Sequence, residues 1–115
     1  MIRATFKTEN GGFCGFEIAG HSGYASAGSD IVCAAVSAMA GLVIHIAADI
    51  YKDGGKVLQD EKNARLSFLS ADSASFALIE GLHGQIAALA EEYPEYVTVK
   101  IKETVSADDT AQKKE

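Results

Sequence analysis

Apolar and polar residues alternate at the start of the chain, along residues 2–8. The apolar positions are Ile2, Ala4 and Phe6. A period of two predicts a strand with one buried face. Asn10-Gly11-Gly12 then predicts a hairpin turn, because Asn and Gly tolerate positive φ. A second strand is expected through Cys14, Phe16 and Ile18, with Cys14 directed toward the core.

A polar loop and a long apolar segment follow this hairpin. Residues 20–29 contain three glycines and three serines, which predicts a solvated loop. Ser29-Asp30 is a helix N-cap signal, and the helix is expected to run to about Ile50 and to end at Lys52-Asp53-Gly54-Gly55. Because this helix is apolar nearly all round, we expect it to be buried on more than one side, in the core or against a second copy.

The same helix requires a membrane check. Residues 31–48 contain no Asp, Glu, Lys or Arg, and this length is the lower limit for a spanning helix. However, Asp30 and Asp49 bracket the segment and no cationic flank sets an orientation. We therefore predict a core helix and no membrane partner.

The second half of the chain repeats the order of elements. Short strands are expected around Val57 and through residues 64–68, with a turn near residues 60–63. Asp72-Ser73 predicts the cap of a second helix, which Pro94 stops. The alternation in residues 97–102 predicts a last strand. The order β-β-α-β-β-α-β predicts a two-layer α+β domain, with a mostly antiparallel sheet covered by two helices. We expect one domain over residues 1–104 and a polar, disordered tail over residues 105–115.

Composition and charge narrow the functional classes. The chain has 115 residues, 48% of them hydrophobic, and its only cysteines are Cys14 and Cys33, with no C-x-x-C pair. We expect no disulfide framework, no metal site, no cofactor and no secretory signal, and hence a cytoplasmic location. The formal charge is −6, and the linear sequence shows no basic stripe, so no direct nucleic-acid partner is expected. An acidic surface instead favours a basic partner.

A cysteine and a histidine carry the candidate chemistry. Cys33 is placed in the first turn of the helix, where unpaired N–H groups favour a thiolate and could act as oxyanion donors. His21, in the loop before it, could accept the thiol proton and protonate a leaving amine.

Other interpretations of these residues remain open. A cysteine in an apolar helix is often only a packing residue, and a histidine in a polar loop is often only solvated. The glycine-rich loop before a helix could instead bind an anion, although it lacks the phosphate-loop motifs. His45 and His83 have no ligands at metal-site spacing and are interpreted as structural or surface residues.

The residues around this pair resemble a known family. Gly20-His21-Ser22, followed by Gly28-Ser29-Asp30-Ile31-Val32-Cys33-Ala34-Ala35-Val36-Ser37, resembles the ribosomal-processing cysteine protease family, called Prp, whose pattern is a G-H loop and G-x-D-I-V-C-A-A-V-S. Length, element order and acidic balance also fit, from Met1 to about Glu103. The family usually has Ala after the histidine, where this chain has Ser22.

The resemblance implies a homodimeric cysteine endopeptidase that removes the N-terminal extension of the bacterial large-subunit ribosomal protein twenty-seven during ribosome assembly. Matched by position, it makes Cys33 the nucleophile and His21 the base, with Asp30 and Ser37 in supporting roles. Asp30 is equally explained as a helix cap. The substrate-binding loop would include Gly20, Ser22, Gly23 and Gly28. The basic precursor would suit an acidic enzyme. A non-catalytic ribosome-associated binding module and an anion-binding regulatory domain are the alternatives.

Overall fold

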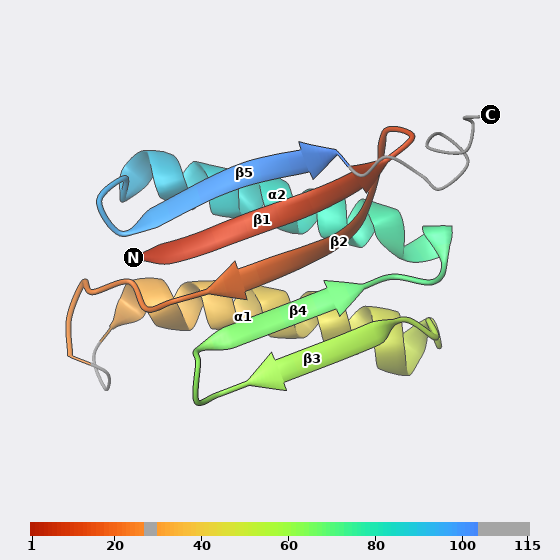
Figure 1. The fold of residues 1–115 in the computed structure, drawn as a ribbon, viewed down its shortest axis with the longest axis horizontal. Helices are drawn as coiled ribbons and strands as arrows, with labels where there is room; N and C mark the ends of the chain where they lie inside the picture. The colour runs from red at the N-terminus through yellow and green to blue at the C-terminus, as the bar shows by residue number, and fades with distance from the viewer. Residues whose placement is uncertain (27–29, 104–115) are drawn as a thin grey trace.

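The fold is described by a computed structural model over residues 1–26 and 30–103 (Figure 1). The elements, in chain order, are β1 (Ile2–Glu9), β2 (Gly12–Ala19), α1 (Ile31–His45), the π-helical turn η2 (Ile46–Ile50), β3 (Lys56–Asp60), β4 (Arg65–Leu69), the 3₁₀ turn η3 (Ser73–Ser75), α2 (Phe76–Glu92) and β5 (Val97–Glu103). The predicted element order is therefore confirmed. The tail expected from Val105 lies outside the described residues.

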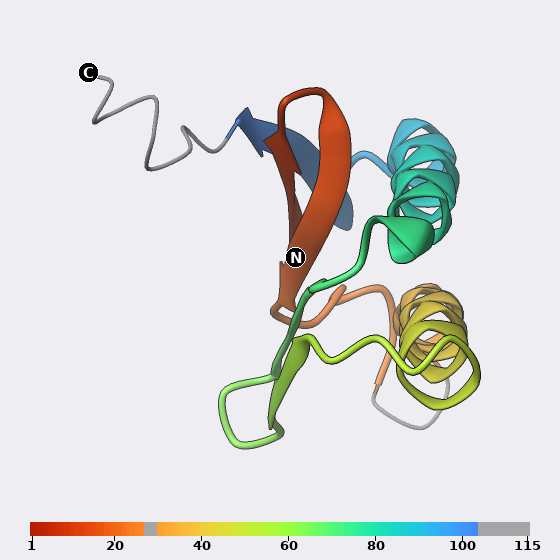
Figure 2. The ribbon, with the colours of Figure 1, turned by 90° about the vertical axis from the view of Figure 1, so that its right-hand side faces the viewer.

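The five strands form one sheet in the order β3-β4-β2-β1-β5. The neighbouring pairs β1–β2, β2–β4 and β3–β4 are antiparallel, whereas β5 runs parallel to β1, with Ile2 opposite Val97. Both helices lie on one face of the sheet, and the other face is open (Figure 2). The predicted two-layer α+β class is confirmed, and the parallel β1–β5 pair makes the sheet mixed.

The core lies between the sheet and the two helices. Phe6, Phe16 and Phe68 are directly opposite one another on three adjacent strands. Their ring centroids are 5.8 and 6.2 Å apart, and all three side chains are buried. Ile79 and Ile86 of α2 are completely buried in the same cluster. The period-two and helical patterns therefore identified the residues that hold the layers together.

Cys14 is buried, as expected, but it lies outside this core cluster. The register of the β1–β2 pair shifts between Lys7 and Thr8, which leaves Cys14 without a residue opposite it. Its Sγ donates to the Lys7 carbonyl oxygen at 3.6 Å. The expected burial of Cys14 is therefore confirmed, although the irregularity in the ladder interrupts the strict period-two alternation with Phe16.

Helix α1 buries only one side in the single chain. Val32, Val36 and Ala40 are buried, but Ile31 is 57% exposed and Leu42 60% exposed. The expected burial on more than one side is therefore not provided by this chain's own fold. By length and composition alone, the helical segment Ile31–Ile50 is apolar enough to cross a membrane, a test that core helices also pass.

The buried carboxylate of Asp53, which follows η2, connects the end of this helical segment to the residues that precede α2. Asp53 Oδ1 accepts hydrogen bonds from the backbone N–H groups of Gly55 and Ala71, both at 2.8 Å. Its Oδ2 accepts from the hydroxyls of Ser70 at 2.6 Å and Ser75 at 2.7 Å. Burial raises the pKa of Asp53, but the four donors lower it by more, so the pKa lies below its ordinary value. The charged form of Asp53 therefore stabilises the fold.

We expect Asp53→Ala to lower the free energy of unfolding by about 3 kcal/mol at neutral pH, because two backbone N–H groups in part-buried hydrogen bonds and two hydroxyls lose a charged acceptor. A carboxyl with a lowered pKa stabilises the fold above its ordinary pKa, and that contribution is lost as the pH falls through the lowered value. The difference in unfolding free energy between the wild type and Asp53→Ala should therefore become smaller in acid. Urea unfolding at neutral and acidic pH measures both effects.

Asp49→Ala is the matched control, since among the described residues Asp49 pairs only with His45, on the surface at 2.8 Å. Its loss should stay below about 1 kcal/mol. Equal losses for the two variants would contradict the role assigned to Asp53.

Candidate active site

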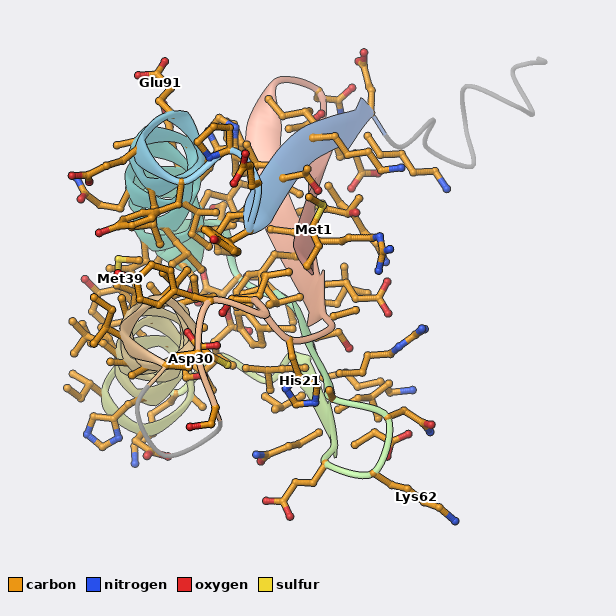
Figure 3. The ribbon with its side chains drawn as sticks, turned by 90° about the vertical axis from the view of Figure 1, so that its left-hand side faces the viewer. Met1, His21, Asp30, Met39, Lys62 and Glu91 are labelled. Carbon is orange, nitrogen blue, oxygen red and sulfur yellow. The ribbon has the colours of Figure 1, made fainter. Side chains whose placement is uncertain are left out.

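The chain leaves the sheet at Gly20, directly before His21. Gly20 has a φ of +93°, and a Cβ there would collide with the carbonyl oxygen of Met1. Its N–H donates to the carbonyl oxygen of Ala64 at 2.9 Å, next to β4. Only glycine fits this conformation and this close approach. Gly20 therefore directs the chain so that His21 follows the end of β2 (Figure 3).

Asp30 joins the loop to the start of α1. Its Oδ1 accepts from the backbone N–H of Cys33 at 2.9 Å, which makes Asp30 the N-cap. Its Oδ2 accepts from the hydroxyl of Ser22, and this hydroxyl in turn accepts from the N–H of Tyr24 at 3.0 Å. Asp30 and Ser22 are both buried. The loop was expected to be too polar to form part of the core, but Ser22 is buried and its hydroxyl is satisfied by Asp30.

These hydrogen bonds define the role of Asp30. The hydroxyl of Ser22, then the N–H of Cys33, hold the pKa of Asp30 below its ordinary value. Ser22 is adjacent to His21 in the chain, and the cap lies three residues before Cys33. Both oxygens thus have partners that tie the His21 loop to the Cys33 helix. Within residues 1–26 and 30–103, Asp30 forms no hydrogen bond with His21, so the geometry favours a positioning role.

A cluster of three tyrosines holds the same loop from its other side. The ring of Tyr24 meets those of Tyr93 and Tyr96 edge-on, at centroid distances of 5.7 and 5.3 Å. Tyr93 ends α2, and Tyr96 precedes β5. Edge-to-face contacts of this kind stabilise a packed arrangement. The loop is therefore attached both to α1 and to the α2–β5 connection.

A pocket of about 430 Å³ brings the predicted catalytic pair together. Cys33, His21, Ser37 and Gly20 all line it. Ser37 lies one turn after Cys33 on the same face of α1. His21 is exposed and Cys33 is partly buried, so a solvent-borne peptide can reach both. In the described part of the chain, no hydrogen bond joins Cys33 Sγ to His21; apo sites often tighten such contacts only with substrate.

The other predicted loop residues do not line the pocket. Ser22 and Asp30 are not among its lining residues and form the buried pair described above. Gly23 is exposed, with a φ of +75°. Gly28 lies outside the described residues. The expectation that helix N–H groups serve as oxyanion donors fails for Cys33, because its N–H is already bound to Asp30.

The opposite wall of the pocket comes from the β3–β4 hairpin, to which sequence reasoning assigned no functional role. Its lining residues are Val57, Gln59, Asp60, Glu61, Ala64, Arg65 and Leu66. With Ile18, Val36, Ala40 and Ile44, they give the pocket an apolar floor and a charged rim. No local motif marks these positions, since only the pairing of β4 with β2 places the hairpin opposite α1.

The remaining cysteine and histidines lie elsewhere. Burial, followed by the charge of Glu9, raises the pKa of Cys14. His45 pairs with Asp49 on the surface, and the ring of His83 packs against Phe6 and Phe13 at 5.1 and 5.2 Å. Over the residues that the structure describes, no group of three or more His, Cys, Asp or Glu could hold a metal ion. Of the cysteines and histidines, Cys33 and His21 are therefore the two that line the pocket.

Comparison with known proteins gives a match to a family model and matches to solved structures. The family model described as cysteine protease Prp matches residues 1–98. The structure of SMU.848 from Streptococcus mutans is 31% identical, covers 90% of this chain and 96% of that chain, and has a TM-score of 0.77. No protein with curated annotation matches significantly.

Two further structures are of the essential ribosomal processing protease Prp from S. aureus. One, in complex with a covalently linked product peptide, has a TM-score of 0.82 and 20% identity, and covers 89% of this chain and all of that chain. The other, with a substrate peptide, has a TM-score of 0.78 and 19% identity, with the same coverage. Because they are only 20% and 19% identical to this chain, these two structures support the fold and nothing beyond it.

The family model spans most of the chain and includes both Cys33 and His21. The resemblance noted in the sequence is therefore confirmed, and with it the class of enzyme. The known function of this family is removal of the N-terminal extension of large-subunit ribosomal protein twenty-seven. The chain belongs to the cysteine protease Prp family.

Proposed function

We propose that Cys33 is the nucleophile and His21 the general base of this protease. The observation that carries the proposal is that both side chains line one solvent-accessible pocket. The thiolate attacks the scissile carbonyl carbon, and the resulting tetrahedral intermediate expels the amine as His21 supplies its proton. Water, deprotonated by His21, then cleaves the thioester and restores the thiol. The covalently linked product in the S. aureus relative supports such a covalent route.

His21 is the proposed partner of the Cys33 thiol. The N-terminal end of α1 carries a partial positive charge, and the Asp30 carboxylate occupies it as the helix cap. An imidazolium at His21 would pair with the thiolate, as in other cysteine–histidine pairs. Asp30 and Ser37 are accordingly proposed as supporting residues, with Asp30 acting through the helix cap and the loop.

The walls of the pocket suggest how a peptide is held. Val36, Ala40 and Val57 offer an apolar floor for a side chain next to the scissile bond, while Asp60 and Glu61 place carboxylates at the rim. Such a site suits an apolar residue within a basic segment. This combination, and the net charge of −6, supports the basic precursor of ribosomal protein twenty-seven as the partner of this chain.

The exposed side of α1 supports a homodimer. Ile31 and Leu42 of α1 and Ile50 of η2 are each more than half exposed, and a second copy would cover them. Because Cys33 lies on the opposite side of this helix, facing the sheet, such a dimer leaves the pocket open. We assign the enzyme to the cytoplasm without a membrane span, consistent with two free thiols.

The anion-binding alternative receives less support from the geometry. A bound phosphate would need the N–H groups at the start of α1. The carboxylate of Asp30 accepts from one of them and would repel a second anion. A non-catalytic module is also disfavoured, because it would have no need to keep Cys33 and His21 in one pocket.

Cys33→Ala should abolish cleavage of the precursor while substrate binding is largely retained. His21→Ala should reduce the rate by at least about 10²-fold, the usual effect of losing a general base. Mass spectrometry of the precursor after incubation measures both. Cys14→Ala is the matched control and should retain activity. Cleavage at a near wild-type rate by Cys33→Ala would refute the assignment.

The two thiols should differ in reactivity. Burial raises the pKa of Cys14 and restricts access to its sulfur, whereas Cys33 lines an open pocket. Limiting iodoacetamide near neutral pH should therefore label Cys33 first and stop turnover in proportion. His21→Ala should slow this labelling. Peptide mapping decides the site, and preferential labelling of Cys14 with activity retained would reverse the assignment.

Ser22→Ala should shift the acid limit of the enzyme to higher pH. The hydroxyl of Ser22 is the main group holding the pKa of Asp30 down, so its removal raises that pKa toward the ordinary value of about 3.9. The stabilisation by charged Asp30 is then lost earlier as the pH falls. Activity and unfolding profiles in acid measure the shift, with the exposed Ser73→Ala as control. Identical acid limbs for the wild type and Ser22→Ala would show that the bond is dispensable.

A further inference from the structure

The open face of the sheet gathers cations that are far apart in the sequence. In β1, Arg3 and Lys7 occupy positions that alternate with the buried residues Ile2, Ala4 and Phe6, so they point away from the helices. In β5, Lys100 and Lys102 do the same. The parallel pairing of β1 with β5 places all four on one side of the sheet. Both helices cover the other side (Figure 2). We call these four residues the cationic patch.

The register of this pair leaves the patch electrostatically unbalanced. Lys7 lies directly opposite Lys102, and Thr5 lies opposite Lys100. Like charges directly opposite each other on neighbouring strands destabilise a sheet. Ion pairs within the described ranges join His45 to Asp49 and Arg65 to Glu17, and none involves the cationic patch. Two carboxylates share this face: Glu17 lies opposite Thr5 and is paired with Arg65, and Glu9 follows Lys7 in β1. Among the described residues, neither forms an ion pair with the four cations.

A simpler role for lysines on an edge strand is to prevent pairing with another sheet edge. That role accounts for Lys100 and Lys102, because β5 is at the edge. It does not account for Arg3 and Lys7, since β1 lies inside the sheet between β2 and β5. Nor does edge protection require lysines from two strands to face each other.

The composition of the patch indicates which polyanion it fits. Protein interfaces are depleted in lysine at their centre and depend on buried aromatic or apolar anchors. Between these four cations lie only Thr5 and Thr98, with no apolar side chain. Lysine, arginine and threonine are among the side chains that contact phosphate oxygens. Without an aromatic platform, the patch can hold a sugar–phosphate backbone but not stack its bases.

We propose that the cationic patch on β1 and β5 is a binding surface for the phosphate backbone of RNA, independent of base sequence. The absence of a basic stripe in the linear sequence argued against such a partner. The parallel strand pairing changes this expectation, because it joins residues near the two ends of the chain. The patch lies on the opposite face of the sheet from Cys33, so RNA and a peptide substrate can be bound together.

The test measures binding of the full-length protein to fluorescein-labelled poly(U) RNA by fluorescence anisotropy over a range of salt concentrations. Four phosphate contacts predict a slope of about −3 for log K against log salt, from about −0.7 per contact on a single strand. The double variant Lys7→Gln, Lys102→Gln should halve this slope and weaken binding at low salt about tenfold or more.

The double variant Lys52→Gln, Lys62→Gln is the matched control, since it removes the same charge from residues outside the patch. It should bind poly(U) like the wild type. Equal weakening by both pairs would reduce the effect to net charge and overturn the proposal, as would no measurable binding by the wild type at low salt. Competition by poly-glutamate as effective as by unlabelled poly(U) would overturn RNA in favour of an acidic protein partner.

A second readout separates binding from folding. Because Lys7 and Lys102 repel each other, the patch variant should have an unchanged or higher unfolding midpoint while it loses RNA binding. Its cleavage of a short peptide substrate should equal that of the wild type, because the patch does not line the pocket. Loss of RNA binding together with a lower unfolding midpoint would indicate a structural role for the lysines and would overturn the proposal.

Discussion

The carboxylate of Asp30 is the constraint on which the site depends. One oxygen fixes the first turn of α1 through the N–H of Cys33, and the other fixes the loop through the hydroxyl of Ser22, next to His21. The two proposed catalytic residues belong to different elements, so their relative position depends on a connection of this kind. The same carboxylate occupies the positive end of the helix. The geometry that fixes the turn of Cys33 therefore also places a carboxylate at the start of the helix, and the proposed partner of the thiol is His21 in the adjoining loop.

Local pattern was sufficient for much of the fold. The alternation in β1 and β5, the cap signals at Asp30 and Asp72, and the stop at Pro94 each depend on a few neighbouring residues, and each was predictable. The motif around Cys33 and His21 likewise led to one shared pocket. The features that were missed depend on long-range pairing. No neighbouring residue signals that β5 joins β1 in parallel, that Cys14 lies at a register shift, or that Ser22 becomes buried against Asp30 eight residues later.

The pocket exists because the helical layer does not cover the whole sheet. All residues of β3 are exposed, including Val57 and Leu58. This strand is held mainly by its backbone ladder with β4, because little of its apolar surface is buried. A compact core beneath α1 would have filled the space where Cys33 and His21 face the hairpin. The exposed apolar residues of β3 and α1 are thus a cost in stability that accompanies an accessible site, as is common at functional surfaces.

The charge distribution shows why a net value describes a surface poorly. At physiological ionic strength, exposed charges are screened beyond about 8 Å. A bound chain therefore senses the side chains near it and not the total of −6. The pocket rim, with Asp60 and Glu61, presents carboxylates to one ligand, while the opposite face of the same sheet presents Lys7 and Lys102 to another. Since strands expose alternate residues on opposite faces, a single sheet can keep the two surfaces apart without a second domain.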